Sequence, residues 1–170
     1  SINYFGVVEV TEGLRAALER RRGGVVVISS NSAPMSTDAA YVELLLAGDE
    51  AGAGARVTGQ NGQVAYSGSK MAVARWVRRN APEWAALGVR LNAIAPGLIK
   101  TPLTASATSD ARFAEAMKAF EDSIPVGRAG QPADIAAMAC FLLSSAAGFV
   151  CGSVLFVDGG HDAMFRPDQF

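Results

Sequence analysis

Three short apolar runs, separated by segments of helical periodicity, constrain the fold of this chain more than any other feature. The runs are residues 25–30 (VVVISS), 89–97 (VRLNAIAPG) and 153–157 (SVLFV). Apolar residues that follow one another without alternation are typical of strands buried on both faces, as in a parallel sheet. Helical segments between such strands predict right-handed crossovers that cover both faces of that sheet. The sequence therefore predicts an α/β fold.

The first helical segment spans residues 3–21. Gly23 and Gly24 are expected to terminate it, because glycine readily adopts the left-handed conformation that closes a helix. The basic residues from Arg20 to Arg22 fit this interpretation, since cations are favoured at the carboxyl end of a helix. The three arginines therefore indicate a helix end and not a binding site for a partner. A formal net charge of −1 also argues against a nucleic-acid partner.

Further helices are predicted at residues 64–80 and 109–121, and a last one begins at Pro132. Proline is favoured in the first turn of a helix, whereas Pro82 and Gly88 are expected to punctuate the segment that follows residue 80. The helix over 64–80 has the clearest pattern. Its expected core positions are Val73, Trp76 and Val77.

Residues 31–63 lack sustained periodicity. A short helix is expected from Tyr41 to Leu46, capped by Ser36 or Thr37 and ended by a glycine. The following stretch, AGAGARVTGQNG, is expected to be a loop. Its GAG could be mistaken for a phosphate-binding glycine loop, but no strand precedes it and no clear helix follows it. We therefore assign no phosphate site there.

The sheet that these runs predict is thin for a doubly wound fold. No G-x-G-x-x-G fingerprint follows any of the three strands, and the chain begins inside a helix. We therefore expect residues 1–170 to form a single domain that is the carboxy-terminal part of a Rossmann-type doubly wound parallel sheet, with the amino-terminal cofactor-binding half absent. The first strand would then have an unpaired edge.

Several functional classes are excluded by composition. The chain has two cysteines, Cys140 and Cys151, without metal-ligand spacing, and we see no secretory signal and no membrane-spanning run. A cytoplasmic protein with no metal and no membrane partner is expected, with both thiols in the core. The only histidine, His161, is interpreted as a non-catalytic loop residue after the last strand.

Tyr66 and Lys70 lie in the string YSGSK, four positions apart within the predicted helix. This spacing puts both side chains on one helix face. A free phenol has a pKa of about 10, and a nearby ammonium lowers that value. A drop of about three units needs roughly 4 kcal/mol of differential stabilisation, which a buried lysine in a low-dielectric cleft and a cationic nicotinamide ring could together supply. The pair therefore predicts a tyrosine general acid/base.

Polar and turn residues follow the first two strands. Ser29 and Ser30 end the first strand, and Pro96 and Gly97 end the second. Ligands of an open parallel sheet bind outside the carboxyl ends of its strands. A serine there can donate a hydrogen bond to a substrate carbonyl, and a glycine allows the backbone to approach a ligand closely. Each feature alone is also consistent with an ordinary turn.

The ordered combination of these strings resembles the short-chain dehydrogenase/reductase family over essentially the whole chain. The strings are VVVISS, YSGSK, RLNAIAPGLIKTPL, PVGRAGQPADIAAMACFLLSS and GSVLFVDGG. The resemblance implies that Tyr66 is the catalytic acid/base, that Lys70 binds the nicotinamide ribose and lowers the tyrosine pKa, and that Ser30 orients the carbonyl. It also implies that Asn3 holds a water of the proton relay, and that NAD is the cofactor, with NADP not excluded. The nicotinamide-contacting segment would comprise Pro96, Gly97, Ile99 and Thr101, besides Tyr66 and Lys70.

The chain departs from the family pattern by an insertion over roughly residues 34–60. With INYFG at the start and RPDQF at the end, this arrangement is similar to the bacterial 3α-hydroxysteroid dehydrogenase/carbonyl reductase subgroup. The insertion could be a substrate lid, or it could block or reshape a subunit interface. Tyr41, Leu44, Leu45 and Leu46 suit either role.

The resemblance implies an NAD(P)-dependent oxidoreductase that interconverts a hydrophobic ketone and a secondary alcohol, with a 3α-hydroxysteroid as the favoured substrate. One alternative is a 3-oxoacyl reductase of lipid synthesis. Another is a non-catalytic truncated homologue that acts as a binding or assembly module. The partners expected are a small carbonyl or alcohol substrate and a second copy of the chain, as a dimer or tetramer. These 170 residues alone are expected to bind cofactor poorly.

Overall fold

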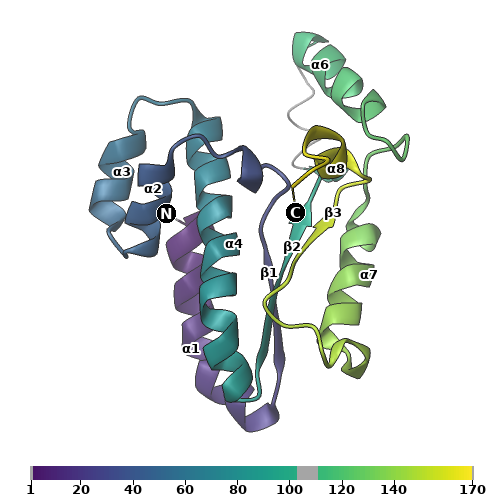
Figure 1. Cartoon of the computed structure of the whole chain (residues 1–170). Coiled ribbons are helices and arrows are strands. Elements are labelled where there is room, and N and C mark those ends of the chain that lie inside the picture. Colours follow the sequence, from purple (N-terminus) through teal and green to yellow (C-terminus); the bar gives the residue numbers. More distant parts are fainter. Residues whose placement is uncertain (1, 103–110, 170) are drawn as a thin grey trace.

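A three-stranded parallel sheet with the order β1-β2-β3 organises the computed structural model, which describes residues 2–102 and 111–169 (Figure 1). The strands are β1 (Gly24–Ile28), β2 (Arg90–Pro96) and β3 (Val154–Val157). Both pairings are parallel. The predicted α/β fold is therefore confirmed, and the carboxyl ends of all three strands lie at one edge of the sheet.

Helices cover both faces of the sheet. On one face, α1 (Val7–Arg21) and α4 (Gly62–Ala86) pack against Val27, Leu91 and Ala93. On the other face, α7 (Pro132–Leu143) packs against Val26 and Ile94. Because successive side chains of a strand point to opposite faces, this two-sided cover explains the continuous apolar runs.

The amino-terminal helix ends differently from the expectation. A π-helical segment, η1 (Ile2–Gly6), leads into α1. The left-handed residue that closes α1 is Arg22, with φ 49°, and its N–H donates to the Glu19 carbonyl at 3.1 Å. Gly23 is instead constrained by packing, since a Cβ there would lie 3.1 Å from the Leu18 side chain. The prediction that glycine closes the helix was therefore wrong, and Gly24 already begins β1.

The helix α4 contains the predicted core positions Val73, Trp76 and Val77, all of which are buried. It does not stop at Pro82, which lies exposed inside the helix, and it continues to Ala86. The expected break at Pro82 was wrong, because the turn beyond it is held by the fully buried Trp84. Gly88, with φ +82°, follows the end of the helix as expected.

The insertion is more helical than predicted. It contains a 3₁₀ turn, η2 (Ala33–Met35), and the helices α2 (Ala39–Leu46) and α3 (Glu50–Val57). The short helix was predicted correctly, but its cap is Asp38, whose side chain accepts from the Tyr41 N–H at 3.0 Å. The expected loop over residues 51–62 was wrong in its first part. Asp49 caps α3 by accepting from the Gly52 N–H, and the small residue Ala53 is buried in the core.

The insertion packs on α4, with α2 and α3 beside that helix in Figure 1. Tyr41, Val42 and Leu45 are all buried in this contact. The Tyr41 ring lies so close to Gly68 that a Cβ at position 68 would be 2.5 Å from Tyr41 Cδ1. The insertion therefore packs against the YSGSK turn of α4, and its buried residues belong to the core.

The carboxy-terminal part contains α6 (Ala111–Asp122), α7, the 3₁₀ turn η4 (Ser145–Ala147), β3 and α8 (His161–Phe165). Residues 109 and 110 of the predicted helix lie outside the described residues. His161 is not in a loop: it begins α8, is 1% exposed, and its ring lies 4.6 Å from that of Phe120. The cysteines Cys140 and Cys151 are exposed, so their expected place in the core was wrong.

Candidate active site

Ser29 and Ser30 lie at the carboxyl end of β1, where both are buried. The backbone around them is tied to β2, because the Ser29 N–H donates to the Ile94 carbonyl at 2.7 Å and the Asn31 N–H donates to the Pro96 carbonyl at 3.0 Å. Two hydroxyls are thus held on a rigid sheet edge of the kind that binds ligands in open parallel sheets.

Two reciprocal hydrogen bonds join this strand end to Lys70 of α4. The Ser29 hydroxyl donates to the Lys70 carbonyl at 2.9 Å, and the Lys70 Nζ donates to the Ile28 carbonyl at 2.9 Å. Burial lowers the pKa of the Lys70 ammonium. The ammonium therefore has a fixed position next to β1, and two of its three protons are not used in this contact.

Tyr66 lies one turn before Lys70 on α4, on the same side of the helix. The Lys70 Nζ is 5.9 Å from the centre of the Tyr66 ring, and the tyrosine is 40% exposed. Among the described residues, no hydrogen bond joins the Tyr66 hydroxyl to Ser30 or to Lys70. The predicted pairing of phenol and ammonium on one helix face is present, and the hydroxyl can accept a further partner.

Within residues 2–102 and 111–169, no hydrogen bond joins the Asn3 side chain to Ser30, Tyr66 or Lys70. Asn3 lies on η1, and its side chain is exposed. The role of Asn3 in a water relay stays a prediction.

The segment after β2 contains the residues expected to contact a nicotinamide ring. The Gly97 N–H donates to the Val157 carbonyl at 3.1 Å, and a Cβ on Gly97 would lie 2.6 Å from the Asp158 Cβ. The structural reason for this glycine is thus close packing on Asp158. Ile99 pairs with Gly130 in a parallel bridge, and Thr101 is half-buried.

Asp158 was not identified from the sequence, yet it links the ends of β1 and β3. Its carboxylate accepts from the N–H groups of Gly160 at 3.0 Å and Asp162 at 2.6 Å, and from the Asn31 side chain at 3.4 Å. The string DGG gives a local signal for a turn. The contact with Asn31 has no sequence signal, because 127 positions separate the two residues.

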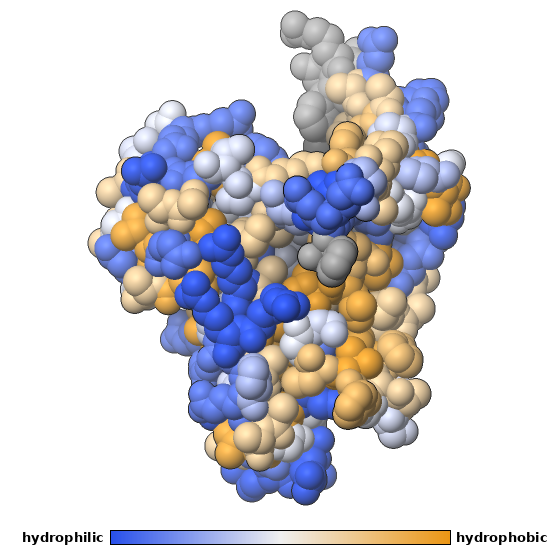
Figure 2. All heavy atoms as spheres, viewed as in Figure 1, coloured by the Kyte–Doolittle hydropathy of each residue, from blue (hydrophilic) through white to orange (hydrophobic). Residues whose placement is uncertain are grey.

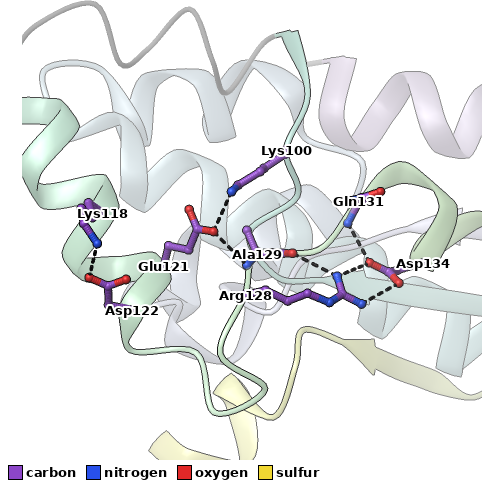
Figure 3. A network of polar contacts seen from close by, with 8 residues as sticks. All are labelled: Lys100, Lys118, Glu121, Asp122, Arg128, Ala129, Gln131 and Asp134. Atoms are coloured by element: carbon purple, nitrogen blue, oxygen red, sulfur yellow. Dashed lines mark hydrogen bonds and ion pairs between the residues drawn. The ribbon is translucent and has the colours of Figure 1, made fainter.

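A charged network fixes the segments that flank α6 (Figure 3). Glu121 accepts from the Lys100 ammonium at 2.7 Å and from the Ala129 N–H at 3.3 Å. The Lys100 hydrogen bond and the backbone N–H together hold the pKa of the Glu121 carboxyl below its ordinary value. The network thereby connects the segment after β2 with the end of α6.

The same network continues at the start of α7. Arg128 donates two hydrogen bonds to the Asp134 carboxylate, at 2.8 and 3.0 Å, and the Gln131 N–H donates to it at 2.7 Å (Figure 3). These bonds lower the pKa of Asp134 to about 2. Beside the network, a cavity of about 180 Å³ is lined by residues that include Leu98, Ile99 and Val157.

No group of three or more His, Cys, Asp or Glu side chains that could hold a metal ion occurs within residues 2–102 and 111–169. In the same residues, no helix combines the length and the apolar character needed to cross a membrane.

Comparison with known families and proteins gives consistent matches. A family model described as enoyl-(acyl carrier protein) reductase matches residues 51–162. The 3-alpha-hydroxysteroid dehydrogenase/carbonyl reductase of Comamonas testosteroni is 41% identical over the whole chain, which covers 68% of that relative. The galactitol 2-dehydrogenase (L-tagatose-forming) of Cereibacter sphaeroides is 46% identical over 56% of the chain and 37% of that relative.

Solved structures agree with these matches. The 3-alpha-hydroxysteroid dehydrogenase from Pseudomonas sp. B-0831, complexed with NADH, superposes with a TM-score of 0.89 at 44% identity, over 99% of this chain and 67% of that one. A structure assigned as a 2-deoxy-d-gluconate 3-dehydrogenase from Agrobacterium tumefaciens, with bound NADP, has a TM-score of 0.71 at 32% identity, over 95% of this chain and 56% of that one. The chain therefore spans about two thirds of the length of the two 3-alpha-hydroxysteroid dehydrogenases that it matches from end to end.

Proposed function

The chain belongs to the short-chain dehydrogenase/reductase family, and we propose that it supplies the catalytic part of an NAD(P)-dependent oxidoreductase acting on a hydrophobic ketone or secondary alcohol. The observation that carries this proposal is the convergence of Ser30, Lys70 and Tyr66 beside the carboxyl end of β1. A hydroxyl donor, a fixed cation and a phenol are the groups that carbonyl reduction needs from a protein.

The residues at this edge fit a nicotinamide cofactor. Lys70 has three N–H donors, one of which is used on the Ile28 carbonyl, so two can be donated to ribose hydroxyls. A bound nicotinamide ring supplies the hydride for reduction or accepts it in oxidation. NAD is the proposed cofactor, because the NADH-bound relative is similar over nearly the whole chain, and NADP is the alternative.

In the reducing direction, Ser30 donates a hydrogen bond to the carbonyl oxygen of the substrate. Tyr66 transfers its hydroxyl proton to the same oxygen as the carbonyl carbon gains the hydride, so that the ketone becomes a secondary alcohol. The nearby Lys70 cation stabilises the resulting phenolate. In oxidation, Tyr66 takes up the alcohol proton. Asn3 would relay protons through water from the exposed side of η1.

For the substrate, we propose a 3α-hydroxysteroid or the corresponding 3-ketosteroid. The support is similarity to two 3-alpha-hydroxysteroid dehydrogenases over the entire chain, including the insertion. A 3-oxoacyl reductase is the second candidate, because the matching family model is described by an acyl carrier protein substrate. Comparing kcat/KM for a 3-ketosteroid and a 3-oxoacyl thioester would distinguish the two.

The decisive test is Tyr66→Phe in the complete enzyme that contains this chain. General acid catalysis contributes about 10²- to 10⁴-fold, so kcat should fall by that factor while the fold is retained. Tyr41→Phe is the matched control, because Tyr41 is buried outside the site and the pKa of its phenol is raised by burial. Unchanged turnover in Tyr66→Phe would refute the proposed mechanism.

These 170 residues alone should bind NADH weakly or not at all. In the described sheet, β1 has a partner strand on one side, and the other side opens on an apolar groove lined by residues that include Leu14, Val26 and Leu143. An unpaired strand edge beside an exposed apolar groove is stabilised when a further strand or helix packs on it. A titration that detected micromolar NADH binding to the 170-residue chain would contradict this expectation.

Homo-oligomerisation, as a dimer or tetramer, and a cytoplasmic location are also proposed. Apolar residues gather on the face over β3 and α7 in Figure 2. Phe149, in the segment that joins η4 to β3, is fully exposed. Exposed apolar patches often mark protein contacts. Sedimentation equilibrium of the complete enzyme measures the oligomeric state, and a monomer at micromolar concentration would exclude this part of the proposal.

A further inference from the structure

We propose that Ser32 is a positioning residue that fixes the Ser30 hydroxyl as a hydrogen-bond donor toward the substrate oxygen. The inference rests on the proposed function and adds a residue to its site. The observation is a pair of contacts: the Ser32 N–H lies 3.1 Å from Ser30 Oγ, and the Ser32 hydroxyl lies 3.0 Å from the same oxygen. Both contacts end on the atom that is proposed to touch the substrate.

The backbone of this segment is rigid enough for the two contacts to be maintained. The Asn31 N–H donates to the Pro96 carbonyl at 3.0 Å, and the Ala33 N–H donates to the Ser30 carbonyl at 3.0 Å as η2 begins. These bonds hold Ser32 in a tight turn over Ser30. The distance between the two hydroxyls is therefore set by the turn and by the sheet.

The hydrogen-bond inventory of a serine then determines the direction of the Ser30 proton. A hydroxyl has two lone pairs and one proton. The Ser32 N–H can act solely as a donor, and the Ser32 hydroxyl, as the second donor, fills the other lone pair of Ser30 Oγ. The Ser30 proton is then left without a partner among these groups and must be donated elsewhere.

Burial limits the groups that can compete for the Ser30 proton. Ser30 is 6% exposed, so bulk water has little access to compete for its hydroxyl. The neighbouring Ser29 hydroxyl is used on the Lys70 carbonyl and does not interfere. A hydroxyl that accepts two hydrogen bonds is polarised and becomes a better donor, which strengthens its bond to a carbonyl oxygen as negative charge develops there.

The test is Ser32→Ala in the complete enzyme. Loss of one hydrogen bond corresponds to about a three- to tenfold effect, and we expect it in kcat with KM changed less than about twofold. Ser32→Thr retains the hydroxyl and should keep most of the wild-type kcat. Ser36→Ala is the matched control, because the Ser36 hydroxyl is buried in the same segment and has no hydrogen-bond partner among the described residues.

A double-mutant cycle separates positioning from a structural role. If Ser32 acts through Ser30, adding Ser32→Ala to Ser30→Ala should change kcat less than about twofold. Additive losses, or an unchanged kcat in Ser32→Ala, would overturn the inference. Thermal unfolding of each variant identifies a loss that comes from misfolding. If Ser30→Ala and Tyr66→Phe also leave turnover unchanged, the proposed function itself has failed, which is a different result.

Discussion

The two ends of the described sheet edge are built in opposite ways. At the end of β1, buried hydroxyls and backbone carbonyls meet one half-buried ammonium, Lys70. Beyond β2 and β3, paired charges at the surface hold the chain together, as in Lys100 with Glu121 and Arg128 with Asp134. Buried hydrogen bonds persist in salt, whereas exposed ion pairs are screened and contribute little each. The chemistry that we propose therefore lies at the hydrogen-bonded end of β1, and the ion pairs beyond β2 and β3 hold the segments that flank it.

Among changes that compare the end of β1 with the ion pairs beyond β2 and β3, Lys70→Met should have the largest effect, and this effect is on activity. Removing the cation leaves the Tyr66 phenolate without a nearby counter-charge, so kcat/KM should fall by about 10²-fold or more. Steady-state kinetics in the complete enzyme measures this loss. Lys118→Met, on the exposed side of α6, is the control and should leave kcat/KM unchanged.

The pH dependence of stability provides a second readout for Lys70. Burial lowers the pKa of this ammonium in the folded state below the ordinary value of 10.5. The charged form therefore costs stability at lower pH, and this cost is relieved as pH rises through the folded-state pKa toward 10.5. The stability of wild type relative to Lys70→Met should thus increase over that range in urea unfolding. A difference that stays constant with pH would contradict the expectation.

The next largest effect is on stability and comes from Gly68→Ala. The new methyl group would meet the Tyr41 ring at 2.5 Å, and overpacking of this kind costs about 1–3 kcal/mol. Gly54→Ala in α3 is the matched control, because nothing lies within 4 Å of a Cβ there. That variant should gain up to about 1 kcal/mol from helix propensity. Urea denaturation of both variants would show whether the insertion is essential to the YSGSK turn.

Acid should weaken the ion pair between Asp134 and Arg128 and so lower the free energy of unfolding. The pKa of Asp134 is lowered to about 2 from an ordinary 3.8, so its contribution to stability is complete above 3.8 and is lost as pH falls toward 2. Asp134→Asn should therefore reduce the steepness of acid destabilisation between about pH 4 and pH 2. Acid unfolding followed by circular dichroism measures it. If the variant and wild type lose stability in parallel, the ion pair with Arg128 has no net role.

The smallest effect is expected for Lys100→Met. The Lys100 side chain is 63% exposed in its pair with Glu121, and exposed ion pairs contribute about 0.2–1 kcal/mol. The difference from wild type should shrink further at 1 M salt, where charges are screened over about 3 Å. Urea midpoints at low and high salt provide the measurement. A loss of stability that persists in 1 M salt would show that Lys100 stabilises the fold by something other than its exposed ion pair with Glu121.

Local patterns in the sequence predicted the features that depend on neighbouring residues. Apolar runs located β1, β2 and β3, and periodicity located most of α4, because burial on a sheet or helix face repeats at a fixed spacing. The four-residue spacing of Tyr66 and Lys70 placed both on one helix face for the same reason. Ser29 and Ser30 were located by their position at a strand end, and the resemblance to the family singled out Ser30.

Tertiary contacts decided the rest. The helix α3 formed over a glycine-rich stretch because Ala53 packs into the core, and α4 continued past Pro82 because Trp84 is buried beyond it. The left-handed Arg22 closes α1 because this turn lets the Arg22 N–H donate to the Glu19 carbonyl and the Gly23 N–H donate to the Leu18 carbonyl.

The same division applies to the site. The sequence by itself determined which chemical groups the chain could offer and on which strands and helices they lie, since these follow from short-range geometry. The tertiary structure alone decided that the Lys70 ammonium meets the Ile28 carbonyl and that Asp158 reaches Asn31. Such contacts join positions far apart in the chain, and no local repeat encodes them.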